Sequence, residues 1–256
     1  MFDRTTLPKF KTVAVPISVG DFADHISEIV RFGHARVSSY ACMVNTHMTV
    51  EAYRDPGFKE IVESADLATA DGMPVLRSLQ VFHQVKQERV AGNDVLPAVL
   101  DAAEREGLSV YFIGGSEDVL EQIRSKVASE FPCLCVAGTS SPPFRELTGH
   151  EEQEIVQVIN NSGANIVFVS FGCPKQEYWM ARMKGRINAM MLGVGGAFSL
   201  YAGIDSRAPR WMRDLSLEWL YRLAREPRRL WKRYLINNSW YVFLFLKTWL
   251  TGAYKS

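Results

Sequence analysis

The sequence has few cysteines and few histidines, and their spacing argues against two common kinds of site. Its four cysteines include no CxxC pair, and three lie in or beside apolar runs, which favours buried, reduced thiols over a disulfide framework. Its five histidines include no HxxxH or HxH pair, and no DxD-like carboxylate pair stands out, so a bound metal is not indicated. We predict a reduced, cytoplasmic protein with no metal and no cofactor.

Long apolar runs are also missing. No stretch of about 18 uncharged apolar residues is present, which argues against a membrane-spanning helix. The start of the sequence lacks the continuous apolar core of a signal peptide. An apolar fraction of 47% is nevertheless ordinary for a globular protein, and the 256 residues suit one domain, or one domain with an appendage.

The net charge of +1 conceals two parts of different composition. Residues 1–204 contain 18 Lys and Arg against 24 Asp and Glu, whereas residues 205–256 contain 11 against 4. The second part also holds five of the six tryptophans. We therefore predict a main domain over 1–204 and a helical, basic and aromatic appendage over 205–256.

Short apolar runs alternate with amphipathic stretches in the first part. Runs typical of strands occupy 37–44, 67–70, 109–113, 134–137, 166–171 and 189–194. Apolar residues recur at helical spacing in 94–106, 118–131 and 151–161. Ser116 is expected to cap a helix, and Gly107 and Gly163 to end helices. This order predicts an α/β fold with a mostly parallel sheet flanked by helices.

Glycine-rich turns follow three of the predicted strands. They contain Gly114 and Gly115, Gly172, and the GVGG segment with Gly195. Such turns let backbone amides approach a phosphate at the start of the next helix, at the sheet edge where ligands of α/β proteins bind. For any one turn alone the simpler interpretation is a tight turn, but three on one sheet favour a nucleotide or sugar-nucleotide site. Neither GxxxxGK[ST] nor GxGxxG is present, so kinase-like and dehydrogenase functions have little support.

Polar side chains follow two other predicted strands. Asp71 comes directly after the run LATA, where it is placed either to take a proton from an attacking hydroxyl or to cap the next helix. Spacing alone favours the cap. Asn45 follows the run YACMV and is expected either to bind a ligand or to cap the helix that follows.

The segment GCPKQE opens a helix after the strand-like run FVSF. Lys175 and Gln176 are placed to reach a diphosphate or a sugar hydroxyl. In the alternative interpretation, Pro174 simply occupies the first helical turn and Glu177 interacts favourably with the helix dipole.

The basic residues of the appendage are interleaved with aromatic ones, a pattern typical of proteins that bind nucleic acid or an anionic membrane. The following run WYVFLFLKTWL (240–250) is too short to span a bilayer, yet strongly apolar. Nucleic acid gives no reason for that run, so we predict contact with a membrane surface. The alternative is the basic face of an ordinary packed helix.

Taken together and in this order, the motifs resemble those of the WecG/TagA/CpsF family of bacterial glycosyltransferases. The resemblance covers roughly residues 12–235 and is carried by VNTHM (44–48), ADGMPV (70–75), ERVAGND (88–94), FIGGS (112–116), FGCPKQEYW (171–179), GVGGAF (193–198) and RAPRWMRDLSLEWLYRLAREPRR (207–229). Each element is weak alone, and together they are quite specific.

The resemblance implies an enzyme with a Rossmann-like catalytic domain. Such an enzyme transfers a sugar from a UDP-sugar to an undecaprenyl-diphosphate-linked acceptor at the inner face of the plasma membrane, inverting the anomeric centre without a metal. The products are cell-surface or extracellular polysaccharides, such as teichoic acid or exopolysaccharide.

The resemblance also assigns roles to individual residues. It makes Asp71 the catalytic base, while Asn45, Arg89 and Gln176 become donor or acceptor contacts. In the basic appendage, thought to dock on the membrane and close over the diphosphate, the matching cations are Arg222, Arg225 and Arg228.

One departure concerns the sugar pocket. Met43 stands where many relatives have a threonine. The transferred sugar can therefore be N-acetylmannosamine, the common one in the family, or glucose or another hexose. A different class of function is a non-catalytic scaffold that binds sugar nucleotides or lipid phosphates in a polysaccharide assembly complex. Nucleic acid is not an expected partner, and a homo-oligomer stays open.

Overall fold

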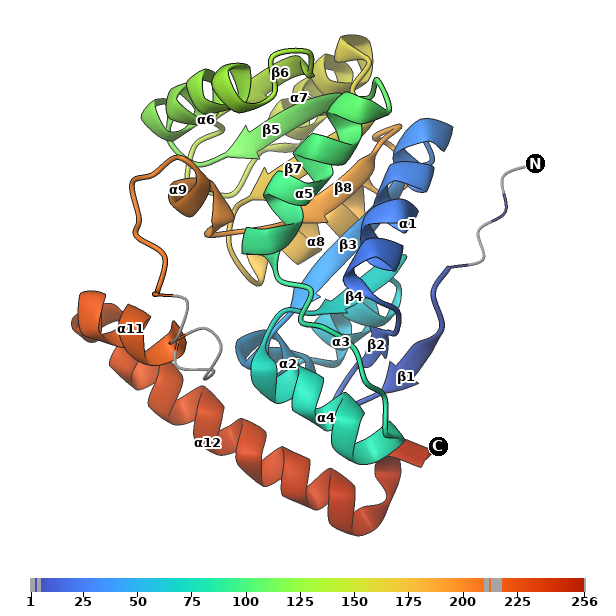
Figure 1. Ribbon diagram of the computed structural model, residues 1–256, viewed down its shortest axis with the longest axis vertical. Coiled ribbons are helices and arrows are strands. Elements are labelled where there is room, and N and C mark those ends of the chain that lie inside the picture. Colours follow the sequence, from blue (N-terminus) through green and yellow to red (C-terminus); the bar gives the residue numbers. More distant parts are fainter. Residues whose placement is uncertain (1–2, 4–5, 210–211, 213–217, 256) are drawn as a thin grey trace.

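A six-stranded parallel sheet forms the centre of the structure, a computed structural model that describes residues 3, 6–209, 212 and 218–255 (Figure 1). Across the sheet the strands lie in the order β4 (Leu67–Ala70), β3 (Ser39–Val44), β8 (Met190–Gly193), β7 (Ile166–Ser170), β5 (Ser109–Gly114) and β6 (Cys135–Ser140). The predicted α/β class with a parallel sheet is confirmed. A separate antiparallel hairpin of β1 (Lys9–Lys11) and β2 (Pro16–Ser18) precedes it.

The central strands are apolar on both sides because helices cover both faces of the sheet. One face carries α1 (Phe22–Ala35), α5 (Gly92–Arg105), α6 (Glu117–Glu130) and α9 (Ala197–Tyr201). The other carries α2 (Thr46–Arg54), α3 (Pro56–Glu63), α4 (Met73–His83), α7 (Gly149–Ser162) and α8 (Lys175–Met183). Successive residues of each strand alternate between these two cores: Phe112 packs in the first and Tyr111 in the second.

Several predicted helix ends are confirmed. Ser116 caps α6, because its side chain accepts a hydrogen bond from the backbone of Val119. Gly163 ends α7 in the left-handed conformation, with φ of 75°. A further helix begins at Pro227, whose fixed φ and missing N–H suit the first helical position.

The C-terminal part consists of α11 (Glu218–Arg225), α12 (Pro227–Thr251) and a short 3-10 turn, η1 (Ala253–Lys255). Of the predicted helical appendage, 210–211 and 213–217 lie outside the described residues, and its first described helix is α11. The α12 helix runs along α2 and α4 at one side of the molecule (Figure 1). The domain boundary at 204/205 stays a prediction.

A polar and apolar stripe on α12 packs against the rest of the chain. Its members Asn237, Tyr241, Leu244 and Thr248 recur at helical spacing and are all buried. The Tyr241 hydroxyl lies 2.6 Å from Ser78 Oγ and donates to the carbonyl of Pro74 at 2.9 Å. Two of these residues, Tyr241 and Leu244, belong to the same hydrophobic core as the sheet, so this helix is built into the body of the protein.

The other side of α12 is apolar and exposed. Its large exposed side chains are Trp231, Leu235, Ile236, Trp240, Val242, Phe243, Leu246, Trp249 and Leu250. A contiguous face of this kind is larger than soluble surfaces ordinarily leave in water. Among the described residues, no helix combines the length and apolarity that crossing a bilayer requires.

Candidate active site

The carboxyl ends of the sheet strands lie at one edge, where α/β proteins of this topology bind ligands in a crevice. Because the sheet is parallel, the segments after β4, β3, β8, β7 and β5 all start at one edge. The chain leaves β3 and β7 toward one face but β8 and β5 toward the other, which is the arrangement that opens a ligand crevice in α/β proteins. The α11 helix lies on the side of the molecule toward which these strands run (Figure 1).

Asp71 occupies the β4 end of this crevice. Its backbone N–H donates to the carbonyls of Val44 at 3.0 Å and Thr69 at 3.1 Å, which fixes its position beside the end of β3. The interpretation of Asp71 as a helix cap is wrong, because α4 begins at Met73 with Gly72 as its N-cap and no side-chain cap bond.

Asn45 lies at the end of the neighbouring strand, β3. Its side-chain Oδ1 accepts a hydrogen bond from the backbone N–H of Met48 at 3.2 Å, so the predicted N-cap of α2 is confirmed. A side chain added at Gly72 would lie 3.5 Å from the Asn45 backbone, which shows how closely the two strand ends approach. Asn45 thus stands beside Asp71, and a role in binding ligand stays a prediction.

Arg89 lies next to Asp71 because the segment after α4 runs alongside the end of β4. The N–H of the next residue, Val90, donates to the carbonyl of Ala70 at 3.1 Å. The guanidinium donates from Nη1 to Glu218 Oε2 at 2.9 Å and from Nη2 to Asp94 Oδ2 at 3.2 Å. It is thereby held between the main domain and α11.

These charges form a chain that continues into the C-terminal part. Asp94 also accepts a hydrogen bond from Arg207, so the order is Glu218, Arg89, Asp94, Arg207. Burial disfavours the charged form of Arg89, but the hydrogen bond and charge of Glu218, with the charges of Asp71 and Asp94, outweigh it and raise the pKa of Arg89. The guanidinium therefore stays positively charged beside the Asp71 carboxylate.

Gly114 and Gly115 follow β5 with φ values of +104° and +76°, which favour glycine. A side chain at Gly114 would also collide with the carbonyl of Ser170, because β5 and β7 approach closely there. Close strand packing thus accounts for Gly114. The prediction that the two glycine amides bind a phosphate stays open.

Gln176, the second residue of α8, connects two of the turns at this edge. Its Oε1 accepts from the N–H of Gly172 at 3.2 Å, and its Nε2 donates to the carbonyl of Gly193 at 3.0 Å. Gly195, with φ of +51°, lies beside the same amide. Lys175, by contrast, is exposed at the start of α8.

Glu177 follows Gln176 and is fully buried. Its Oε1 accepts the second hydrogen of Gln176 Nε2 at 2.8 Å. Burial raises the pKa of Glu177 to about 7, against hydrogen bonds from Gln176, its own backbone amide and the Cys173 thiol, which favour the ionised form. Glu177 does lie in the first turn of α8, where the sequence suggested an interaction with the helix dipole, but its burial was not anticipated.

The three arginines of the C-terminal part differ in what the structure describes. Arg225 is exposed on α11, with its Nη1 3.4 Å from the hydroxyl of Tyr221, and Arg228 is exposed on the first turn of α12. The side chain of Arg222 lies outside what the structure describes. Their predicted contact with a diphosphate stays a prediction.

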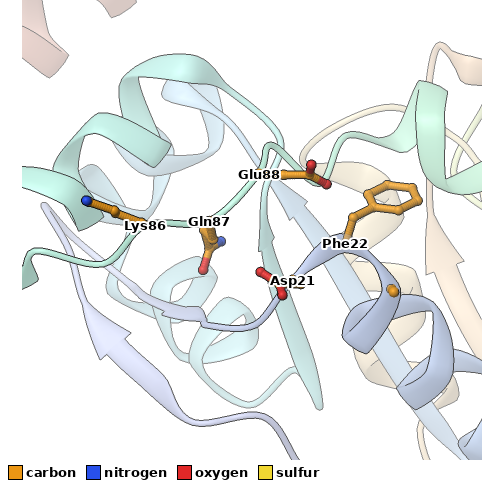
Figure 2. Close-up of a pocket in the computed structure, with 6 residues that line it drawn as sticks. Asp21, Phe22, Lys86, Gln87 and Glu88 are labelled. Carbon is orange, nitrogen blue, oxygen red and sulfur yellow. The ribbon is translucent and has the colours of Figure 1, made fainter.

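A pocket of about 440 Å³ lies beside the N-terminus of α1. Figure 2 shows it between Asp21 and Phe22 on one side and the segment Lys86–Glu88 on the other. None of the predicted site residues lines it. Within the described ranges, no group of His, Cys, Asp and Glu side chains is arranged to hold a metal ion.

Two residues of the site were missed from the sequence. Glu218 lies in the EWLYRL element, yet its contact with Arg89 joins positions 129 residues apart, which no local spacing reveals. Asn237, at a polar position within α12, places its Nδ2 2.9 Å from Nδ1 of His47 and thus ties α12 to the start of α2. The signal that could have indicated this contact is the polar Asn237 within the largely apolar α12.

The fold and the placement of these residues define an α/β protein with a crevice at the carboxyl edge of its sheet, where nucleotide-type ligands bind in this class. The chain belongs to the WecG/TagA/CpsF glycosyl transferase family, whose model matches residues 10–255, nearly the whole length. It is therefore a glycosyltransferase, and the predicted family resemblance is confirmed.

Proposed function

We propose that this glycosyltransferase moves a hexose from a UDP-sugar to an undecaprenyl-diphosphate-linked acceptor, with inversion at the anomeric carbon. N-acetylmannosamine and glucose-type sugars are the donors to test first. The observation that carries the proposal is the position of Asp71, which directly follows β4 at the carboxyl edge of the sheet and lies beside the cationic Arg89. Synthesis of a cell-surface or extracellular polysaccharide is the process that such a transfer serves.

The chemistry proposed for Asp71 is that of a general base. Its carboxylate takes the proton of an acceptor hydroxyl as that oxygen attacks the anomeric carbon, and the bond from this carbon to the UDP oxygen breaks on the opposite face. The charge that develops on the departing diphosphate is stabilised by donors fixed in advance, for which the backbone amides of the glycine turns and the tail cations are suited.

The size of the crevice supports a long, extended donor. From β4 to β5 there are four strand spacings of about 4.8 Å, so the Asp71 end and the Gly114 end stand roughly 19 Å apart. A molecule must be extended along the edge to touch both. A sugar joined through a diphosphate to a nucleoside has this form, with the sugar placed at Asp71 and Asn45.

The exposed face of α12 supports a membrane-bound acceptor. Trp231, Trp240 and Trp249 lie on the same helix as exposed Leu246 and Leu250, and Lys232 and Lys247 are exposed among them. Such a face suits an amphipathic helix lying in the interface of an anionic membrane. We infer a peripheral association with the inner face of the plasma membrane.

Transfer is tested by UDP release from a panel of UDP-sugars with a short-chain lipid-diphosphate-linked sugar as acceptor. Release that depends on the acceptor, and that falls 100-fold or more in Asp71→Asn, by the usual magnitude of roughly 10²–10⁴ for general-base catalysis, supports the proposal. Asp118→Asn, an exposed carboxylate at the start of α6, is the matched control. Normal transfer by Asp71→Asn would refute the role of Asp71, and UDP binding with no turnover would favour the scaffold.

Membrane association is tested by sedimentation with phosphatidylglycerol vesicles. Leu246→Glu with Leu250→Glu removes two exposed leucines and is expected to weaken binding at least tenfold, because each fully buried leucine contributes roughly 1.5–3 kcal/mol. Val158→Glu on α7, at a valine exposed to a similar degree, is the control. Equal binding by all three proteins would show that this face does not meet the membrane.

A further inference from the structure

The Gln176 side chain makes three hydrogen bonds inside the protein. It is buried, its Oε1 accepts from Gly172, and the two hydrogens of Nε2 go to Gly193 and to Glu177. Gly172 belongs to the turn after β7, and Gly193 ends β8. One amide therefore joins two neighbouring turns of the crevice edge.

Glu177 supplies the third of these bonds at a cost to stability. No Lys, Arg or His forms an ion pair with it among the described residues, and its hydrogen bonds come from Gln176, its own backbone amide and the Cys173 thiol. A buried carboxylate without a cation is unfavourable, and a glutamine would keep the acceptor without the charge. Stability thus gives no reason for an acid at this position. The remaining role of the carboxylate is to accept the hydrogen bond from Gln176 Nε2.

We propose that Glu177 is a positioning residue for the sugar-nucleotide donor, acting through Gln176 to fix the turns at 171–174 and 193–196. The inference rests on the proposed function, because those turns lie where the donor diphosphate is expected. The physical reason is that Glu177 accepts the N–H of Gln176 that would otherwise be buried without a partner. With that N–H satisfied, the amide keeps Oε1 on Gly172 and Nε2 on Gly193.

The test compares Glu177→Met, which removes the acceptor, with Glu177→Gln, which keeps one. Full-length proteins are titrated with UDP by calorimetry. Glu177→Met is expected to bind UDP about 10-fold more weakly, the usual effect of losing one hydrogen bond to a charged group, whereas Glu177→Gln stays within about threefold of wild type. In a Gln176→Met background, Glu177→Met is expected to change UDP affinity no further, since Glu177 acts through that amide.

Two controls separate positioning from a general effect on folding. The urea midpoint of Glu177→Gln, which keeps an acceptor for the Gln176 N–H, is expected to equal or exceed that of wild type. Glu152→Met alters another buried carboxylate, whose partners are Arg182 and Arg186, and is expected to leave UDP affinity unchanged. Weakening of UDP binding by Glu152→Met as large as that by Glu177→Met, or equal weakening by Glu177→Gln, would overturn the proposal.

Hydrogen exchange of the Gly172 amide, measured by NMR without ligand, tests the hydrogen bond from Gly172 to Gln176 independently of any donor. It is expected to speed up in Glu177→Met and not in Glu177→Gln, because Gln176 then holds this N–H less well. Unchanged exchange would overturn the positioning role. If wild type fails to bind UDP, the proposed donor is refuted, and the Gly172 exchange still decides whether Glu177 holds the turn.

Discussion

Replacing Glu177 by glutamine is expected to change how the free energy of unfolding depends on pH. The pKa of this buried carboxyl is raised from 4.5 to about 7, so the folded chain holds its proton more tightly than the unfolded chain does. Wild-type stability from this group is therefore fully present below pH 4.5 and is lost as the pH rises toward 7. Glutamine does not titrate and lacks this loss.

The magnitude follows from the two pKa values. At 1.36 kcal/mol per pKa unit, the full loss is about 3 kcal/mol, and most of it falls between pH 5 and pH 8. This is a large share of the 5–15 kcal/mol that typically separates folded from unfolded proteins. The difference in stability between Glu177→Gln and wild type should thus shift in favour of the variant by that amount over this range.

Urea unfolding of both proteins at pH 5, 6, 7 and 8 measures this difference. All other groups titrate alike in the two proteins, so their contributions cancel in the comparison. A difference that stays constant with pH would show that the carboxyl keeps its ordinary pKa and that the burial argument is wrong. A shift in the opposite direction would mean that a cation stabilises the carboxylate.

Three other substitutions have expected outcomes that follow from single contacts. Gly114→Ala should lower stability by roughly 2 kcal/mol or more in urea unfolding, because of its φ of +104° and the collision with the Ser170 carbonyl; full stability would contradict the close approach. Glu218→Gln should cost roughly 1–3 kcal/mol in the same assay by removing the charge paired with Arg89, and a double-mutant cycle with Arg89→Met that shows no coupling would refute the pair. Glu151→Gln should lose stability relative to wild type above pH 4.5 but not at pH 2, because hydrogen bonds lower the pKa of Glu151 to about 2; a pH-independent effect would argue against this.

The order of elements could be predicted from the sequence because it depends on local periodicity. The run predicted at 67–70 is β4 without change, and the helical pattern at 118–131 differs from α6 by one residue at each end. Caps such as Ser116 depend on neighbours three residues away, so they too are visible in the sequence. The positions of Asp71 and Asn45 at strand ends follow from the same local signals.

What the sequence did not reveal depends on contacts between distant segments. The strand order, with β8 between β3 and β7, is set by pairing of segments far apart in the chain. The pairing of Arg89 with Glu218 and the burial of Glu177 likewise arise only when layers meet. Asp71 illustrates the limit. Spacing favoured Asp71 as the cap of the following helix, whereas Gly72 is the N-cap of α4, which begins at Met73.

The attachment of α12 to the main domain fixes the angle between its exposed face and the sheet. This helix of 25 residues, about 37 Å long, is held by the buried stripe over 237–248, which includes Tyr241 and Leu244 and begins with Asn237 on His47. Its exposed face therefore cannot turn independently of the sheet. Any flat surface that covers this face meets the protein at one tilt, and the distance from that surface to the strand ends is the same in every molecule. The height above the surface at which the crevice opens is thus a property of the fold.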